Sequence, residues 1–234
     1  MQALLMLVFL AMSSVALANG KITHLSGSVT VQTVDGQTEP ALPGTEVKVG
    51  DTVITGANGF ARMETTDGGE MVFRPNSEFH IDKYSYDKDK PADDSFVYSM
   101  LKGGLRTVTG LIGKRGNKDA YQGNTPTSTI GIRGTFFEVR VCGDCGSLPK
   151  GTYFSVRSGS IQTGNSAGSL TMSAGQIVFV PPGGAPQVLP NDPGIGFTAP
   201  SAIPKQGEKT DTSSDNSNPA AGDAAGDGVN CSIQ

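Results

Sequence analysis

Two cysteines three positions apart are the residues of this chain best suited to specific chemistry. Cys142 and Cys145 form a C-x-x-C motif, which can be a redox pair, half of a zinc site or a short disulfide. A redox pair needs a βαβ context and a helix N-terminus to lower the thiol pKa, and the surrounding sequence predicts neither. A zinc site needs two further ligands, and the chain offers only the scattered Cys231, His24 and His80. We therefore predict a local disulfide and no metal site.

A histidine and an aspartate two positions apart form the other candidate for chemistry. Alternate residues of a strand point to the same face, so His80 and Asp82 would share one face if "FHIDKY" is a strand. No nucleophile signature of the G-x-S-x-G type accompanies them. We predict no catalytic site and no cofactor, and we interpret His80 as an ordinary surface histidine.

The stretch "NTPTSTIGIRGTFFEVRV", residues 124–141, changes the parity of its apolar positions. The apolar residues before Gly134, such as Ile132, stand at even-numbered positions. From Phe137 onward the apolar residues stand at odd-numbered positions, as Val139 does. Because alternate side chains point to opposite sheet faces, this change predicts a bulge or sharp bend at Gly134. Arg133 lies beside the bend, and its five donors could hold the carbonyls of a broken ladder.

A functional interpretation of the same residues stays open. Arg133 could instead bind the carboxylate or phosphate of a ligand, although the spacing of a phosphate-binding loop is absent. Phe137 continues the buried run, which leaves Phe136 as a possible exposed contact for a partner.

The beginning of the chain predicts export. An uncharged apolar segment ends in Ala16-Leu17-Ala18, a small-x-small cleavage site, and is short for a membrane span. We predict a signal peptide over residues 1–18 and a periplasmic or secreted protein that is not an integral membrane protein. The net charge of −4 argues against a nucleic-acid partner, because phosphate binding needs clustered Lys and Arg.

The composition changes again near the end. Residues 201–234 hold five acidic residues against two lysines and almost no large apolar side chain. Such a segment cannot bury enough apolar area to offset its ordering entropy, so we predict a disordered acidic tail. Cys231 would be left in this tail, either free or paired with another molecule. One folded domain is expected over residues 19–200.

Short alternating stretches fill that domain. Turn dipeptides such as Asp35-Gly36, Asn58-Gly59 and Asp67-Gly68 separate them. Period-two alternation broken by such turns predicts β-strands, and no segment shows helical periodicity. The expected class is all-β. Short Gly-rich pieces favour a solenoid-like stack of short strands, with a β-sandwich as the alternative.

Three stretches in the expected order resemble the FecR-type domain. "TPTSTIGIRGTFFEV" (125–139) resembles its iGxRGTxF signature, residues 42–81 resemble its opening half, and "LKGGLRTVTG" (101–110) resembles its middle element. The resemblance covers roughly residues 27–180. We expect the positions of the signature that it matches to be structural, namely Gly131, Arg133, Gly134 and Thr135.

The resemblance implies an extracytoplasmic, non-catalytic β module. In the regulators that give the family its name, the domain relays a signal from an outer-membrane transporter to a cytoplasmic sigma factor. Those regulators have a cytoplasmic segment and a transmembrane helix before the domain. Here a predicted signal peptide leads directly into the module, so we expect that this chain does not itself hold a sigma factor.

The expected function is binding or scaffolding in the cell envelope. A rigid β face or an open sheet edge would dock another envelope protein. One alternative is a regulatory module of a cell-surface signalling system. Another is a glycan-binding or wall-binding adhesive module, which would use surface rings such as Phe136, Tyr84 and Tyr86.

Overall fold

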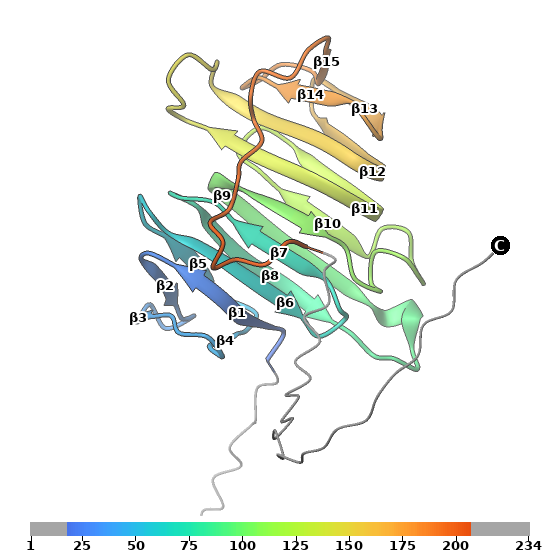
Figure 1. Cartoon of the computed structure of the whole chain (residues 1–234). Coiled ribbons are helices and arrows are strands. Elements are labelled where there is room, and N and C mark those ends of the chain that lie inside the picture. The colour runs from blue at the N-terminus through green and yellow to red at the C-terminus, as the bar shows by residue number, and fades with distance from the viewer. Residues whose placement is uncertain (1–17, 207–234) are drawn as a thin grey trace, which may run out of the picture.

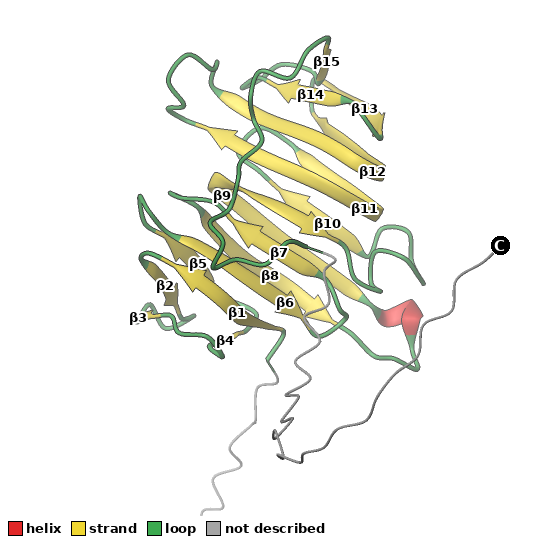
Figure 2. Ribbon diagram, in the orientation of Figure 1, coloured by secondary structure: helices red, strands yellow, loops and turns green. Residues whose placement is uncertain are grey.

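The predicted all-β class is confirmed. The computed structural model describes residues 18–206, in which a mixed sheet accounts for nearly all regular structure (Figures 1 and 2). A single turn of 3-10 helix at Pro91–Asp93 is the exception within these residues. The strands are β1 (Gly20–Ser26), β2 (Val29–Gln32), β3 (Thr38–Pro40), β4 (Glu46–Val47), β5 (Thr52–Thr55), β6 (Phe60–Thr65), β7 (Glu70–Phe73), β8 (Glu78–Ser85), β9 (Ser95–Val108), β10 (Tyr121–Asn124), β11 (Thr129–Cys142), β12 (Gly151–Asn165), β13 (Gly168–Ser173), β14 (Ile177–Val180) and β15 (Gln187–Leu189).

The strand pairings fold this sheet into two layers. One layer runs β4-β1-β6-β7-β9-β11-β12-β14-β15, and the other runs β3-β2-β5-β8-β9-β10-β11-β12-β13. The three long strands β9, β11 and β12 belong to both layers. The first half of β9 pairs with β8 and its second half with β7. Because the chain repeatedly passes from one layer to the other, the strands stack as successive rungs.

A glycine sits where each long strand passes between the layers. Gly103 in β9, Gly134 in β11 and Gly159 in β12 have φ angles of 79°, 57° and 80°. These values lie in the left-handed region, which costs a residue with a β-carbon about 1–2 kcal/mol. The strands can therefore bend there without ending.

Aromatic rings fill the space between the layers. Phe79, Phe96 and Tyr98 are fully or almost fully buried, and the ring centroids of Phe96 and Tyr121 lie 4.9 Å apart. The Tyr98 ring passes over Gly123, where a β-carbon would come within 2.6 Å of its hydroxyl. That hydroxyl is buried and has no hydrogen-bond partner among the described residues.

A buried carboxylate ties the β6–β7 turn to a distant loop. Asp67 accepts hydrogen bonds from the Tyr84 hydroxyl and from the backbone N–H of Ile112, each at 3.0 Å. Burial, reinforced by the neighbouring Asp67 carboxylate, raises the pKa of Tyr84 well above its usual value. The Asp67-Gly68 turn, predicted from its dipeptide alone, is thus a structural anchor.

A segment without regular structure crosses one face of the sheet. We call residues 192–206 the strap; in Figure 1 it is the orange to red chain in front of β9 and β7. Ile195 and Ile203 are buried, and Gln206 donates hydrogen bonds to backbone carbonyls of β7 and β9. The folded part therefore extends at least to Gln206, six residues into the segment that composition assigned to the acidic tail.

The remaining predictions about the ends fall outside the described residues. These are the signal peptide, the tail from residue 207 onward and Cys231. Within residues 18–206, no helix has the length and apolar character that a membrane span requires.

Candidate functional site

The bend in the RGT stretch lies where the parity change predicted it. The register of β11 against β12 shifts between Arg133 and Phe136. Ile132 and Val139, on opposite sides of the shift, are both buried in the core. Gly159 faces Gly134 across the bend, and a β-carbon on Gly159 would come within 2.6 Å of the Gly134 carbonyl oxygen. The two glycines therefore allow β11 and β12 to bend together.

Thr135 supplies the hydrogen bonds at this corner. Its backbone N–H donates to the Thr109 hydroxyl at 2.8 Å, and its own hydroxyl donates to the Ser160 carbonyl at 2.9 Å. The Arg133 side chain is exposed and lines a shallow cavity of about 100 Å³ beside Gly131. Within residues 18–206 its guanidinium makes no hydrogen bond, so the corner role of Arg133 stays a prediction.

The two phenylalanines after the corner lie on opposite faces. Phe137 is completely buried, whereas Phe136 is partly buried and lies between Val108 and Ser158 of the neighbouring strands. A contact between Phe136 and a partner stays a prediction.

The predicted disulfide is confirmed. Cys142 and Cys145 are bonded, with their Cα atoms 5.3 Å apart, at the end of β11. The bridge shapes the turn that follows, in which Cys145 forms an isolated β-bridge with Leu148.

His80 and Asp82 lie side by side in a polar network. His80 Nδ1 is 2.9 Å from the Thr52 hydroxyl, and its Nε2 is 3.8 Å from an Asp82 oxygen. Ser99 donates a hydrogen bond to the same carboxylate. Thr52 is buried, and the partly buried Ser99 is the register partner of His80 on the neighbouring strand. The hydrogen bonds of this network join strands β5, β8 and β9.

A cluster of charged side chains lies on the outer face of the layer that contains β7, β9, β11 and β12. Arg106 of β9 is paired in register with Glu138 of β11. The backbone N–H of Arg74 donates to the carbonyl of Gly104, the register partner of Arg140. Three arginines are thereby held on adjacent strands. We call the surface formed by Arg74, Arg106, Glu138 and Arg140 the arginine face.

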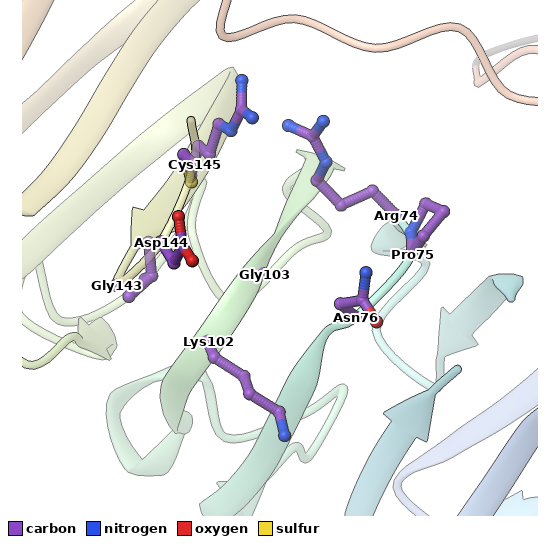
Figure 3. Close-up of a pocket in the computed structure, with 10 residues that line it drawn as sticks. Arg74, Pro75, Asn76, Lys102, Gly103, Gly143, Asp144 and Cys145 are labelled. Carbon is purple, nitrogen blue, oxygen red and sulfur yellow. The ribbon is translucent and has the colours of Figure 1, made fainter. Parts of the chain in front are cut away.

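A cleft of about 360 Å³ opens at the end of this face (Figure 3). Arg74 and Arg140 contribute two guanidiniums, and Lys102 stands at the rim in an ion pair with Glu78 at 3.1 Å. Burial and the nearby Arg140 charge lower the pKa of Arg74, while Glu138 opposes the shift. The cleft residues are Arg74, Pro75, Asn76, Lys102, Gly103, Arg140, Val141, Gly143, Asp144 and Cys145.

The strap lies on the arginine face through its backbone carbonyls. Arg140 donates to Gly194 and Arg74 donates to Ile195, both at 3.1 Å, and Arg106 donates to Phe197 at 2.7 Å. A planar guanidinium is well suited to this role because its donors are rigidly placed. Three arginines of the face thus hold the backbone of the strap.

The arginine face was not predicted from sequence. Its arginines are separated by more than thirty positions along the chain and meet only through strand pairing. One local signal existed: Glu138 and Arg140 alternate with the buried Val139 and Val141, which places both on the outer face.

The fold and this face define a two-layered β module with a rigid, charged surface that already carries a peptide segment. Residues 51–162, from β5 into β12, match the family model described as FecR protein. This match confirms, over residues 51–162, the resemblance to the FecR family seen in the sequence.

Solved structures give partial likenesses. A "Cell surface anchoring domain" is 39% identical over 26% of this chain and 82% of its own chain, with a TM-score of 0.26. A candidate anti-sigma factor from Parabacteroides distasonis is 12% identical, with a TM-score of 0.43, over 58% of this chain and 56% of its own. No curated protein matches the chain.

Proposed function

We propose that this protein is a non-catalytic regulatory module of a cell-surface signalling system, which docks a partner protein on its arginine face. The match of residues 51–162 to the FecR family model supports the regulatory role, because the regulators that give the family its name act in the envelope. The same match favours this role over general scaffolding, which would need the docking surface but no signal.

The cleft at the end of the arginine face is the observation that carries the proposal. Arg74 and Arg140 are placed by strand pairing on either side of β9, and the charge of Arg140 contributes to lowering the pKa of Arg74. Charge that is held in place in a partly desolvated cleft gives specificity to protein association. A partner that places a carboxylate between the two guanidiniums would relieve their mutual repulsion.

Action outside the cytoplasm is part of the proposal. A disulfide between Cys142 and Cys145 persists in an oxidising compartment and is rare in the cytosol. This agrees with the export predicted from residues 1–18.

Two of the three rings expected for the glycan-binding alternative, those of Tyr84 and Tyr86, are engaged within the protein. The Tyr84 hydroxyl is bonded to Asp67, and the Arg115 guanidinium lies 4.9 Å from the centroid of the Tyr86 ring. Sugar binding by stacking needs free ring faces, so we prefer a protein partner.

A site-specific crosslinker would test the docking role in cells. A photoreactive residue in place of Asn76, which is exposed at the cleft, should capture a membrane-embedded partner. The same residue in place of Val34, which is 79% exposed on the distant β2–β3 hairpin, is the matched control and should capture none. Absence of a membrane protein from the Asn76 sample, or equal capture at both positions, would contradict the proposal.

The charge requirement can be tested in the same cells. Arg140→Gln should lower capture at position 76 at least fivefold, since a charged hydrogen bond contributes on the order of 1.5–3 kcal/mol. Lys83→Gln removes an exposed positive charge on β8, in the other layer, and serves as the control. Equal losses in the two variants would mean that net charge, rather than the cleft, attracts the partner.

A further inference from the structure

We propose that the arginine face beneath the strap is a binding site for an extended peptide with an aromatic side chain, occupied by the strap in the free protein and open to a partner's segment by exchange. This inference rests on the proposed docking function and deepens it, because it names the recognised chemistry and the segment that competes for it.

Backbone recognition is the first support. The strap carbonyls of Gly194, Ile195 and Phe197 each accept a hydrogen bond from a different arginine. Gly194 has a φ of 82°, so a competing peptide with a glycine at this position can present its carbonyls to the same donors. The face therefore has the donors needed to hold a segment other than the strap.

An aromatic slot gives this surface its selectivity. The Phe197 ring lies with its centroid 4.8 Å from the Arg106 guanidinium and 5.4 Å from that of Arg74. The ring of Phe60 packs against its edge, with the centroids 6.3 Å apart. Two cations over one ring are attracted by its negative face, so the slot favours an aromatic side chain.

The strap leaves one buried acceptor unpaired. Glu138 is 2% exposed, and its Oε1 accepts a hydrogen bond from Arg106 Nε at 2.6 Å. Its Oε2 is buried and has no partner among the described residues. Gly196 lies directly over this oxygen, and a β-carbon there would stand 3.4 Å away. A residue with a hydroxyl at this position would satisfy the carboxylate.

The strap also leaves space unfilled. A cavity of about 220 Å³ lies between the strap and the sheet, lined by Val72 and Arg106 on one side and by Phe197, Ala199 and Ile203 on the other. Empty space beside apolar groups forfeits contacts that a larger side chain would make. The better-fitting peptide thus has a hydroxyl residue just before its aromatic residue and a larger apolar residue two positions after it.

Exchange requires that the strap can leave without unfolding the sheet. Within residues 18–206, no backbone–backbone hydrogen bond joins the strap to a strand, and the links come from arginine side chains and Gln206. Releasing the strap would therefore break none of the backbone hydrogen bonds that pair the strands. A tethered segment nevertheless competes at a high effective concentration, so a free peptide binds well only when the strap is weakened.

Fluorescence polarisation with labelled strap peptides would test the site on the full chain. The probe is "DPGIGFTAPSAIP", the sequence of residues 192–204. The Phe197→Ala protein, whose own strap is weakened, should bind this peptide at least tenfold more tightly than the control Val188→Ala, an exposed position on β15. A peptide that carries the Phe197→Ala change should lose the binding, and one with Gly196→Ser should bind more tightly than the unchanged probe.

The opposite results would overturn the inference. Equal affinity of the two proteins, or of the peptides with and without the aromatic ring, would show that the face is not an aromatic-peptide site. Hydrogen exchange of the unaltered protein gives a second measurement if Phe197→Ala folds poorly. Excess probe should speed exchange at the Ile195 amide, and unchanged exchange would contradict displacement.

These assays separate the inference from the proposed function. Peptide binding uses purified protein and no cellular partner, whereas capture at Asn76 uses the intact strap. Peptide binding without cellular capture would support the peptide site and contradict the signalling role. Cellular capture without peptide binding would support the docking role and contradict the exchange of the strap for a partner's segment.

Discussion

The hydroxyl of Thr135 connects three segments of the chain at a point where the β11 ladder is interrupted. Its single proton is shared between the carbonyls of Arg133 and Ser160, while the Thr135 backbone N–H donates to the Thr109 hydroxyl. A carbonyl that loses its partner in the interior costs roughly 1–3 kcal/mol. The corner should therefore depend on this small side chain.

We expect Thr135→Val to lower the free energy of unfolding by about 1–3 kcal/mol, since the isosteric valine removes only the donor. Chemical denaturation measures the loss. Arg133→Ala is the comparison, because Arg133 was predicted from sequence to clamp the same corner. A larger loss for Arg133→Ala than for Thr135→Val would assign the clamp to the guanidinium.

Two glycines near the corner should differ sharply in their tolerance of alanine. Gly159 has a φ of 80°, and its β-carbon would meet the Gly134 carbonyl at 2.6 Å. Gly131 has no atom within 4 Å of the corresponding position. Thermal denaturation should show a loss of about 2 kcal/mol or more for Gly159→Ala and a change within about 0.5 kcal/mol for Gly131→Ala. Similar losses would argue against a special backbone at residue 159.

Gly196 offers a rare stabilising substitution. In Gly196→Ser the hydroxyl can donate to the unpaired Glu138 Oε2, which should raise the free energy of unfolding by about 1 kcal/mol. Gly196→Ala is the matched control, because it changes the backbone entropy equally and adds no donor. Calorimetry of the two variants measures the difference, and an equal effect would show that the carboxylate is already satisfied by solvent.

Sequence reasoning succeeded at the residue scale where the signal was local. The parity change located the bend at Gly134, and the C-x-x-C spacing located the disulfide. The arginine face gave no comparable signal, because Arg74, Arg106 and Arg140 share no motif. Their proximity follows from strand register, which is a property of the paired chain.

At the scale of elements, the strands were expected to be shorter than they are. Short Gly-rich pieces were expected to form a stack of short strands. In the structure Gly103 bends β9 and the strand continues into the other layer. A glycine that ends a strand and one that bends it look alike in sequence, since both need the same backbone freedom.

The end of the strap was missed because composition placed the domain boundary at residue 200. Residues 201–206 contain one large apolar residue, Ile203, and composition estimates how much area a segment buries. The strap buries Ile195 and Ile203 and otherwise attaches through carbonyls that every residue has. Amino-acid composition reports on side chains, so it does not reveal a segment that is held through its backbone carbonyls.

The whole molecule should lose stability at alkaline pH. Burial raises the pKa of Tyr84, Tyr98 and Tyr121 above the usual value near 10. Above about pH 10 the unfolded chain releases these phenolic protons while the folded protein retains them, so rising pH favours unfolding. Below that pH the contribution is fully present. Denaturant midpoints measured between pH 8 and 11 should fall only in the upper part of that range.

Tyr98→Phe is the control for this pH dependence. It removes one titrating group and a buried hydroxyl that has no partner, so it should weaken the alkaline loss and stabilise the protein at neutral pH by roughly 1 kcal/mol. An unchanged pH profile would mean that Tyr98 does not titrate on unfolding in this range.

The three shared strands also determine how the domain responds to mechanical load. Because β9, β11 and β12 each run through both layers, neither layer can be pulled away from the other as a separate sheet. A pulling force applied to the strap would first break its hydrogen bonds to the arginines. Only a larger force would act on the strand pairings of the sheet. We therefore expect the strap to detach at a lower force than the force that unfolds the sheet.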